Sequence, residues 1–195
     1  MILTDAPPAL PIQVVFLTGQ SDAARCALSP AQHAFLEALP LPVGARVPRN
    51  FPYGDTAPWR PTSLLTASLS NARQYLASRR PEFAARYAPD VQRQLSQARR
   101  TLILAGSNGL ELLLNLRLST EILDGIEVFA YGPVARQRPS CACVLVQGTR
   151  DWLSRMWFPR VDHRVNCGHL DYLESPQVRD LCAAAVRRVA ARETP

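Results

Sequence analysis

The chain has 195 residues, a 47% hydrophobic content and a formal net charge of +6, values that suit one globular domain over residues 1–195. No apolar run is long enough to cross a bilayer, and the N-terminus lacks the basic and apolar regions of a signal peptide, so we expect a cytoplasmic protein without membrane association. Every basic residue is an arginine, but there is no basic tail and no interleaving of basic with aromatic residues, which argues against nucleic-acid binding.

The five cysteines are odd in number and scattered, which indicates reduced, mostly buried thiols and not a disulfide framework. Cys141 and Cys143 have the spacing of residues on one face of a strand. No further cysteine or histidine lies near them in the sequence, so we predict no metal site.

The first half of the chain begins with a predicted central strand at Val14–Thr18, which ends at Gly19. A helix is predicted to start at Ser29–Gln32, where a serine N-cap, a proline and a glutamine have the spacing of a capping box. A second strand is expected over Ala45–Phe51. Tyr53 follows it at the edge where ligands bind in open α/β sheets, so it either lines a pocket or belongs to the core.

The long connection from Pro61 to Arg99 has the apolar periodicity of helices. Pro81 and Pro89 are both predicted to interrupt it, because proline suits the first turn of a helix and not its interior. We find no repeats, low-complexity tracts or linkers anywhere in the chain.

A sharp strand-to-helix turn is predicted around Ser107. The apolar run Leu102–Ala105 reads as a buried parallel strand, which stops at Gly106, and a helical pattern begins directly after Gly109. Such a turn holds a serine in a strained conformation with its Oγ exposed, and it needs small neighbours because strand and helix pass closely. Taken alone, the motif is equally compatible with a phosphate-binding turn at a helix N-terminus.

Two further polar residues follow predicted strands. The strand Cys141–Gln147 runs into a turn that ends at Asp151, and the strand His163–Asn166 is followed closely by His169. Because the carboxyl ends of parallel strands meet at one edge of a sheet, Ser107, Asp151 and His169 are predicted to lie together.

The order Ser107, Asp151, His169 and the turn at Ser107 resemble the α/β-hydrolase superfamily, whose turn has the consensus Gly-x-Ser-x-Gly. The sequence departs from it at Ala105, which replaces the first glycine. The resemblance implies an α/β fold, a three-layer αβα sandwich with a mostly parallel sheet of about six strands. A further strand, Glu127–Tyr131, belongs to this sheet. The protein would be a minimal member of the superfamily, and it would have no lid, because only the short connection Gly132–Ser140 stands where the family often inserts one.

The resemblance also implies roles for individual residues. Ser107 would be the nucleophile, His169 the base, and Asp151 the group that orients the histidine. The backbone N–H groups of Gln20 and Asn108 would form the oxyanion hole, and the family uses a glycine, here Gly19, to let the first of them point into the site.

We therefore expect a serine hydrolase that cleaves an ester or a thioester without a metal or cofactor. An open, lidless site argues against an interfacially activated lipase, and an arginine-rich surface favours thioesters carried on an acidic acyl carrier protein. Two alternatives remain: a hydrolase-fold scaffold that has lost catalysis, suggested by Ala105, and a nucleotide-binding α/β protein that holds a phosphate at Gly106–Gly109.

Overall fold

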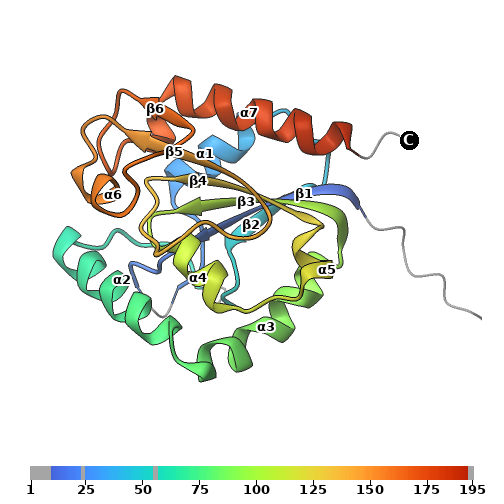
Figure 1. The fold of residues 1–195 in the computed structure, drawn as a ribbon, viewed down its shortest axis with the longest axis horizontal. Helices are drawn as coiled ribbons and strands as arrows, with labels where there is room; N and C mark the ends of the chain where they lie inside the picture. Colours follow the sequence, from blue (N-terminus) through green and yellow to red (C-terminus); the bar gives the residue numbers. More distant parts are fainter. Residues whose placement is uncertain (1–9, 23–24, 55–56, 193–195) are drawn as a thin grey trace, which may run out of the picture.

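The computed structural model describes residues 10–22, 25–54 and 57–192, and these form an α/β structure around one parallel sheet (Figure 1). The six strands of this part of the chain lie in the order β2-β1-β3-β4-β5-β6, and every neighbouring pair is parallel. Their bounds are β1 Leu10–Thr18, β2 Arg46–Asn50, β3 Ala98–Gly106, β4 Ile126–Tyr131, β5 Ala142–Gly148 and β6 His163–Val165.

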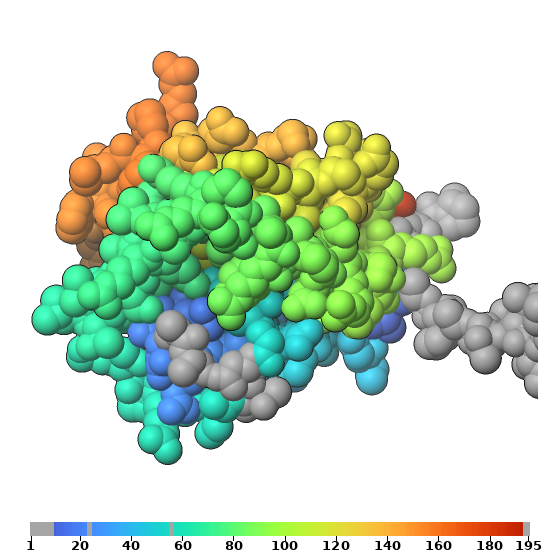
Figure 2. Space-filling model, turned by 90° about the horizontal axis from the view of Figure 1, so that it is seen from below, coloured from blue at the N-terminus to red at the C-terminus, as the bar shows by residue number. Residues whose placement is uncertain are grey.

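Helices cover both faces of the sheet and complete three layers, as predicted (Figure 1). One face carries α1 (Pro30–Glu37) and α7 (Pro176–Ala191), and the other carries α3 (Pro81–Leu95), α4 (Gly109–Asn115) and α5 (Thr120–Leu123). Two helices stand nearer the carboxyl ends of the strands, namely α2 (Leu64–Ser78), which packs on α3 and α4, and α6 (Trp152–Trp157), which follows β5. Seen from below, α2 and α3 cover much of the molecule (Figure 2).

The sheet is buried on both faces because successive side chains of its central strands point into two different cores. In β1, Val14 and Phe16 belong to the core under α1 and α7, whereas Val15 and Leu17 belong to the core under α3 and α4. A strand that is buried on both faces exposes no side chains to solvent, which explains why its sequence is a continuous apolar run.

The predicted strands and helices are present, with ends that differ by a few residues, and the capping box at Ser29 is formed. The predicted break at Pro89 is wrong: α3 runs through it without interruption. Phe83 and Val91, on either side of Pro89, are both buried in the same core, and this packing outweighs the backbone hydrogen bond lost at proline. The short helices α5 and α6 and the 3₁₀ turn at Tyr172–Glu174 had no predicted counterpart.

Within the described residues, none of the helices has both the length and the apolar character that a membrane span requires. No disulfide joins any of the five cysteines, which all lie in the described part of the chain, and burial raises the pKa of the Cys141 thiol to about 11 and that of Cys143 to about 12. The same part of the chain contains no group of three or more His, Cys, Asp or Glu side chains placed to hold a metal ion.

Candidate active site

Ser107 lies at the apex of a tight turn between β3 and α4. Its φ is +51°, in the left-handed region that residues other than glycine rarely adopt. Its N–H donates to the Tyr131 carbonyl oxygen at 3.1 Å. Gly109 is required by the close approach of α4 to β1, since a Cβ there would collide with the Leu17 carbonyl oxygen. Ala105, where the sequence departs from the consensus, is buried in the core beneath α4. This geometry is that of a serine held out of its strand by backbone strain.

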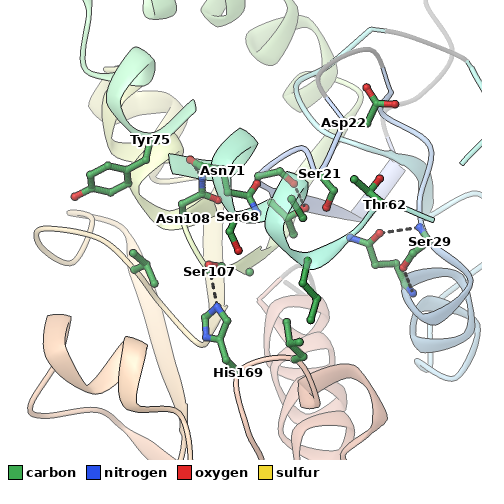
Figure 3. Close-up of a pocket in the computed structure, with 18 of the residues that line it drawn as sticks. Ser21, Asp22, Ser29, Thr62, Ser68, Asn71, Tyr75, Ser107, Asn108 and His169 are labelled. Carbon is green, nitrogen blue, oxygen red and sulfur yellow. Dashed lines mark hydrogen bonds between the residues drawn. The ribbon is translucent and has the colours of Figure 1, made fainter. Parts of the chain in front are cut away.

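The three residues predicted to meet are connected by hydrogen bonds, and Figure 3 shows the one between Ser107 and His169. Ser107 Oγ lies 3.2 Å from His169 Nε2, and His169 Nδ1 lies 2.9 Å from Asp151 Oδ2. With the Nδ1 proton directed at the carboxylate, Nε2 is left to accept the Ser107 proton. The side chain of His169 is 26% exposed, so its imidazole lies between the buried carboxylate and the cavity.

Asp151 is fully buried, and each of its two oxygens accepts hydrogen bonds. Oδ1 accepts the Ser154 N–H at 3.0 Å, so the residue also caps the N-terminus of α6, and Oδ2 accepts from His169 and from the Tyr172 hydroxyl. Burial alone raises the pKa of Asp151, but these hydrogen bonds oppose burial and together hold the pKa below its ordinary value. The carboxylate therefore stays ionised at neutral pH.

Tyr172 is a component of the site that sequence reasoning missed. Its buried hydroxyl donates to Asp151 Oδ2 at 2.7 Å and accepts the Gly148 N–H at 2.6 Å. Burial, and then the hydrogen bond to the carboxylate, raise the pKa of Tyr172 well above its ordinary value, so the hydroxyl keeps its proton. A tyrosine three residues after His169 carries no signal of this contact in the sequence.

Other carboxylates near these residues in sequence lie elsewhere. Asp124 and Asp162 precede β4 and β6, so they lie toward the amino ends of the strands; Asp162 pairs with Arg138 and accepts the Leu145 N–H. Asp171 accepts the Gly168 N–H at 2.9 Å, which fixes the loop that presents His169.

Of the residues expected to form the oxyanion hole, Gly19 and Asn108 line the cavity beside Ser107. A Cβ on Gly19 would lie 2.5 Å from Asn108 Oδ1, so the missing side chain is what allows the two residues to approach. Asn108 Nδ2 donates to the backbone oxygen of Asn71 on α2 at 3.2 Å. The role of the Asn108 N–H stays a prediction.

The expectation that the Gln20 N–H belongs to the oxyanion hole needs correction. Its N–H donates to Gln74 Oε1 at 2.9 Å, its side chain donates to the Arg25 carbonyl oxygen, and it is not among the described residues that line the cavity. In this arrangement the Gln20 N–H is already bonded and does not face an oxyanion. The sequence could not reveal this, because Gln74 comes from α2, 54 residues further along the chain.

The expectation that Tyr53 lines the pocket is also wrong. The residue is buried behind α2, its hydroxyl accepts from Gln74 Nε2 at 2.5 Å, and its ring packs edge-on against Tyr87. Tyr53 therefore belongs to the core, the other reading left open by the sequence.

A cavity of about 770 Å³ opens at Ser107 and His169, with walls formed by more than the sheet edge. The connection Gly132–Ser140 is short, as predicted, and contributes Val134. One side of the cavity is nevertheless walled by α2, which meets α6 through the rings of Tyr75 and Trp157, 5.5 Å apart. The site therefore has a helical wall, although the helix comes from the connection between β2 and β3, not from the place expected for a lid.

The fold and site together define a three-layer α/β protein with a hydrogen-bonded serine, histidine and aspartate at the carboxyl edge of its sheet. The chain matches no model of a known protein family, and it matches none of the curated proteins. The assignment of function therefore rests on the geometry of the site.

Proposed function

We propose that the protein is a serine hydrolase of the α/β-hydrolase type, which cleaves a carboxylic ester or thioester through an acyl-enzyme. The observation that carries the proposal is the hydrogen-bonded chain from Ser107 Oγ through His169 to Asp151, with Ser107 at a positive φ. A phosphate-binding turn would need neither the histidine nor the buried carboxylate, so this chain favours acyl transfer over the nucleotide-binding alternative.

In the proposed mechanism, Ser107 Oγ attacks the acyl carbonyl carbon while His169 Nε2 takes its proton. Asp151, ionised and fixed by Ser154 and Tyr172, holds the imidazole and stabilises its positive charge. The imidazolium then protonates the leaving alcohol or thiol, and the C–O or C–S bond breaks. Water repeats the sequence: His169 takes a proton from it, the hydroxide attacks the acyl-enzyme, and the proton returns to Ser107.

The tetrahedral oxyanion needs backbone donors, and the Asn108 N–H is the group that follows the nucleophile. The Gln20 N–H would serve as the second donor only after Gln74 released it. The Gln74 side chain is held by Tyr53 and by the Gln20 side chain, so a substrate that displaces it must break these contacts.

The test is labelling with a fluorophosphonate, which reacts with activated serines. We expect the wild type to be labelled and Ser107→Ala and His169→Ala to lose the label. Ser68→Ala, another serine of the cavity wall, and His33→Ala, an exposed histidine, are matched controls that keep it. A folded wild type that takes no label contradicts the proposal and favours the scaffold alternative.

The leaving group is decided by comparing acyl esters with acyl thioesters, free and on an acyl carrier protein. Exposed arginines, such as Arg60 in the cavity lining and Arg150 next to Asp151 in the chain, would attract an acidic carrier. If a carrier is the partner, turnover of the carrier-bound thioester falls with added salt while that of a neutral ester does not.

A further inference from the structure

Exposed apolar side chains are concentrated around the mouth of the cavity. Of the nine large hydrophobic residues that are strongly exposed in the described part of the chain, only Val43 is part of neither the cavity lining nor one of the two helices beside it. Four of the others line the cavity itself: Trp59, Leu64, Leu76 and Leu170.

The remaining four are not among the cavity-lining residues and face solvent. Leu65 and Leu69 lie one turn apart on α2, and Trp152 and Met156 lie one turn apart on α6. Leu65 is 72% exposed and Met156 is 73% exposed. The two helices are neighbours at the carboxyl edge of the sheet, joined by the contact between Tyr75 and Trp157 (Figure 1). We call these eight side chains the apolar rim.

A substrate inside the cavity would cover only half of this rim. Contiguous exposed apolar surface on a folded protein marks a surface for a partner. A partner that removes Leu65, Leu69, Trp152 and Met156 from water must therefore cover α2 and α6 outside the cavity.

The charges next to the rim indicate the nature of that partner. Residues 57–78 and 149–160, which carry seven of the eight rim residues, contain five arginines, all exposed: Arg60, Arg73, Arg150, Arg155 and Arg160. Their one carboxylate is Asp151, which is buried and bonded to His169. Leu170, on a third segment, has the acidic neighbours Asp171 and Glu174, and Asp171 is engaged with the Gly168 N–H.

We propose that the apolar rim docks the protein on an anionic lipid surface. Protein surfaces that bind at the membrane interface combine apolar side chains, such as leucine, tryptophan and methionine, with flanking arginines. The apolar side chains enter the acyl region while the guanidinium groups remain among the headgroups. Four of the rim side chains line the cavity that opens at Ser107, so the same lipid phase delivers acyl esters to the site. Docking stands independently, whereas delivery of substrate rests on the proposed function. The short Gly132–Ser140 connection argued against an interfacial enzyme, and the rim on α2 and α6 reverses that argument.

The experiment is vesicle flotation with Ser107→Ala protein, which excludes turnover. We expect it to bind vesicles of phosphatidylcholine with phosphatidylglycerol, and to bind vesicles of phosphatidylcholine alone more weakly. The double variants Leu65→Ser/Leu69→Ser and Trp152→Ser/Met156→Ser, made in this background, should each reduce binding by about tenfold or more, because each removes two apolar anchors.

Matched controls distinguish the contribution of the rim to vesicle binding from that of exposed hydrophobic and arginine side chains elsewhere on the surface. Val43→Ser removes an exposed hydrophobic residue outside the rim, and Arg187→Gln removes an exposed arginine on α7, so both should bind like the parent. Arg150→Gln/Arg155→Gln should weaken binding to anionic vesicles and reduce its salt dependence. Circular dichroism and thermal unfolding check that each variant is folded.

Several outcomes would overturn the docking proposal. These are a folded parent that does not float with anionic vesicles, rim variants that bind as well as the parent, or a parent that dimerises through the rim so that the rim variants alone are monomers. Binding to an acyl carrier protein in place of vesicles would overturn it as well. Fluorophosphonate labelling of otherwise wild-type rim variants keeps the two proposals apart, since labelling reports Ser107 chemistry and flotation reports docking.

Discussion

The cavity has two walls that differ in their side chains: those of one wall are joined by hydrogen bonds, and those of the other are apolar and exposed to solvent. The sheet wall includes Ser107, His169 and Tyr172, and these side chains belong to a hydrogen-bonded network that contains the fully buried carboxylate of Asp151. The helical wall, formed by α2 and α6, exposes leucine, tryptophan and methionine side chains to solvent. A preorganised wall suits chemistry, because its dipoles need no rearrangement during reaction, and an exposed apolar wall suits docking.

The largest effect expected on the sheet wall comes from Asp151→Asn. An amide cannot hold His169 in the reactive tautomer, so kcat should fall by about 10⁴-fold in ester hydrolysis. Asp162→Asn is the matched control, because that carboxylate also accepts a backbone N–H but lies away from the site, and its kcat should stay near that of the wild type. Equal losses in the two variants would contradict the assigned roles.

The next effect concerns the turn that carries Ser107. Gly109→Ala places a methyl group against the Leu17 carbonyl oxygen, and backbone cannot move aside cheaply, so the free energy of unfolding should fall by about 3 kcal/mol or more. This loss exceeds the gain of about 1 kcal/mol that alanine brings to a helix. Urea unfolding measures it. Gly54→Ala, with no atom within 4 Å of the added Cβ, should change stability by less than about 0.5 kcal/mol.

Tyr172→Phe tests whether the buried hydroxyl positions Asp151. It removes a donor from Asp151 Oδ2 and an acceptor from the Gly148 N–H, and we expect a loss of about 2 kcal/mol in unfolding free energy. We also expect kcat to fall about tenfold with KM unchanged, since a looser carboxylate no longer fixes His169. If stability falls while kcat stays the same, Tyr172 supports the fold alone.

A smaller effect is expected from acid. The pKa of Asp151 is lower in the folded protein than in the unfolded chain, so the unfolded chain binds more protons near pH 4. The stability that Asp151 contributes is therefore complete above its ordinary pKa and is lost as pH falls through the lower, folded value. The difference in unfolding free energy between the wild type and Asp151→Asn should be constant from pH 7 to 5 and shrink toward pH 3. A difference that stays constant to pH 3 would exclude the lowered pKa.

The smallest effect is expected on the helical wall. Leu65→Ala, at a side chain that is 72% exposed, should change the unfolding free energy by less than about 0.5 kcal/mol, whereas Leu110→Ala, in the core beneath the nucleophile turn, should lower it by about 2–5 kcal/mol. Comparable losses would mean that Leu65 packs against the fold and is not held out for a partner.

The sequence by itself determined the sheet and the residues of the proposed triad. Strands buried on both faces are continuous apolar runs, and Gly106 and Gly148 mark the ends of β3 and β5. Because parallel strands present their carboxyl ends at one edge, the positions of Ser107, Asp151 and His169 after the strands β3, β5 and β6 predicted that they meet.

Only the tertiary structure decided what surrounds these residues. The bond from the Gln20 N–H to Gln74, the contact of Tyr172 with Asp151 and the continuity of α3 through Pro89 all depend on packing between segments or helices that local sequence patterns do not encode. The apolar rim depends on it too: the leucines of α2 have the periodicity of a buried helix, and nothing in the sequence indicates that all four of them are exposed. Periodicity reports which residues share a face of a helix, whereas the packing of the whole chain decides whether that face is covered.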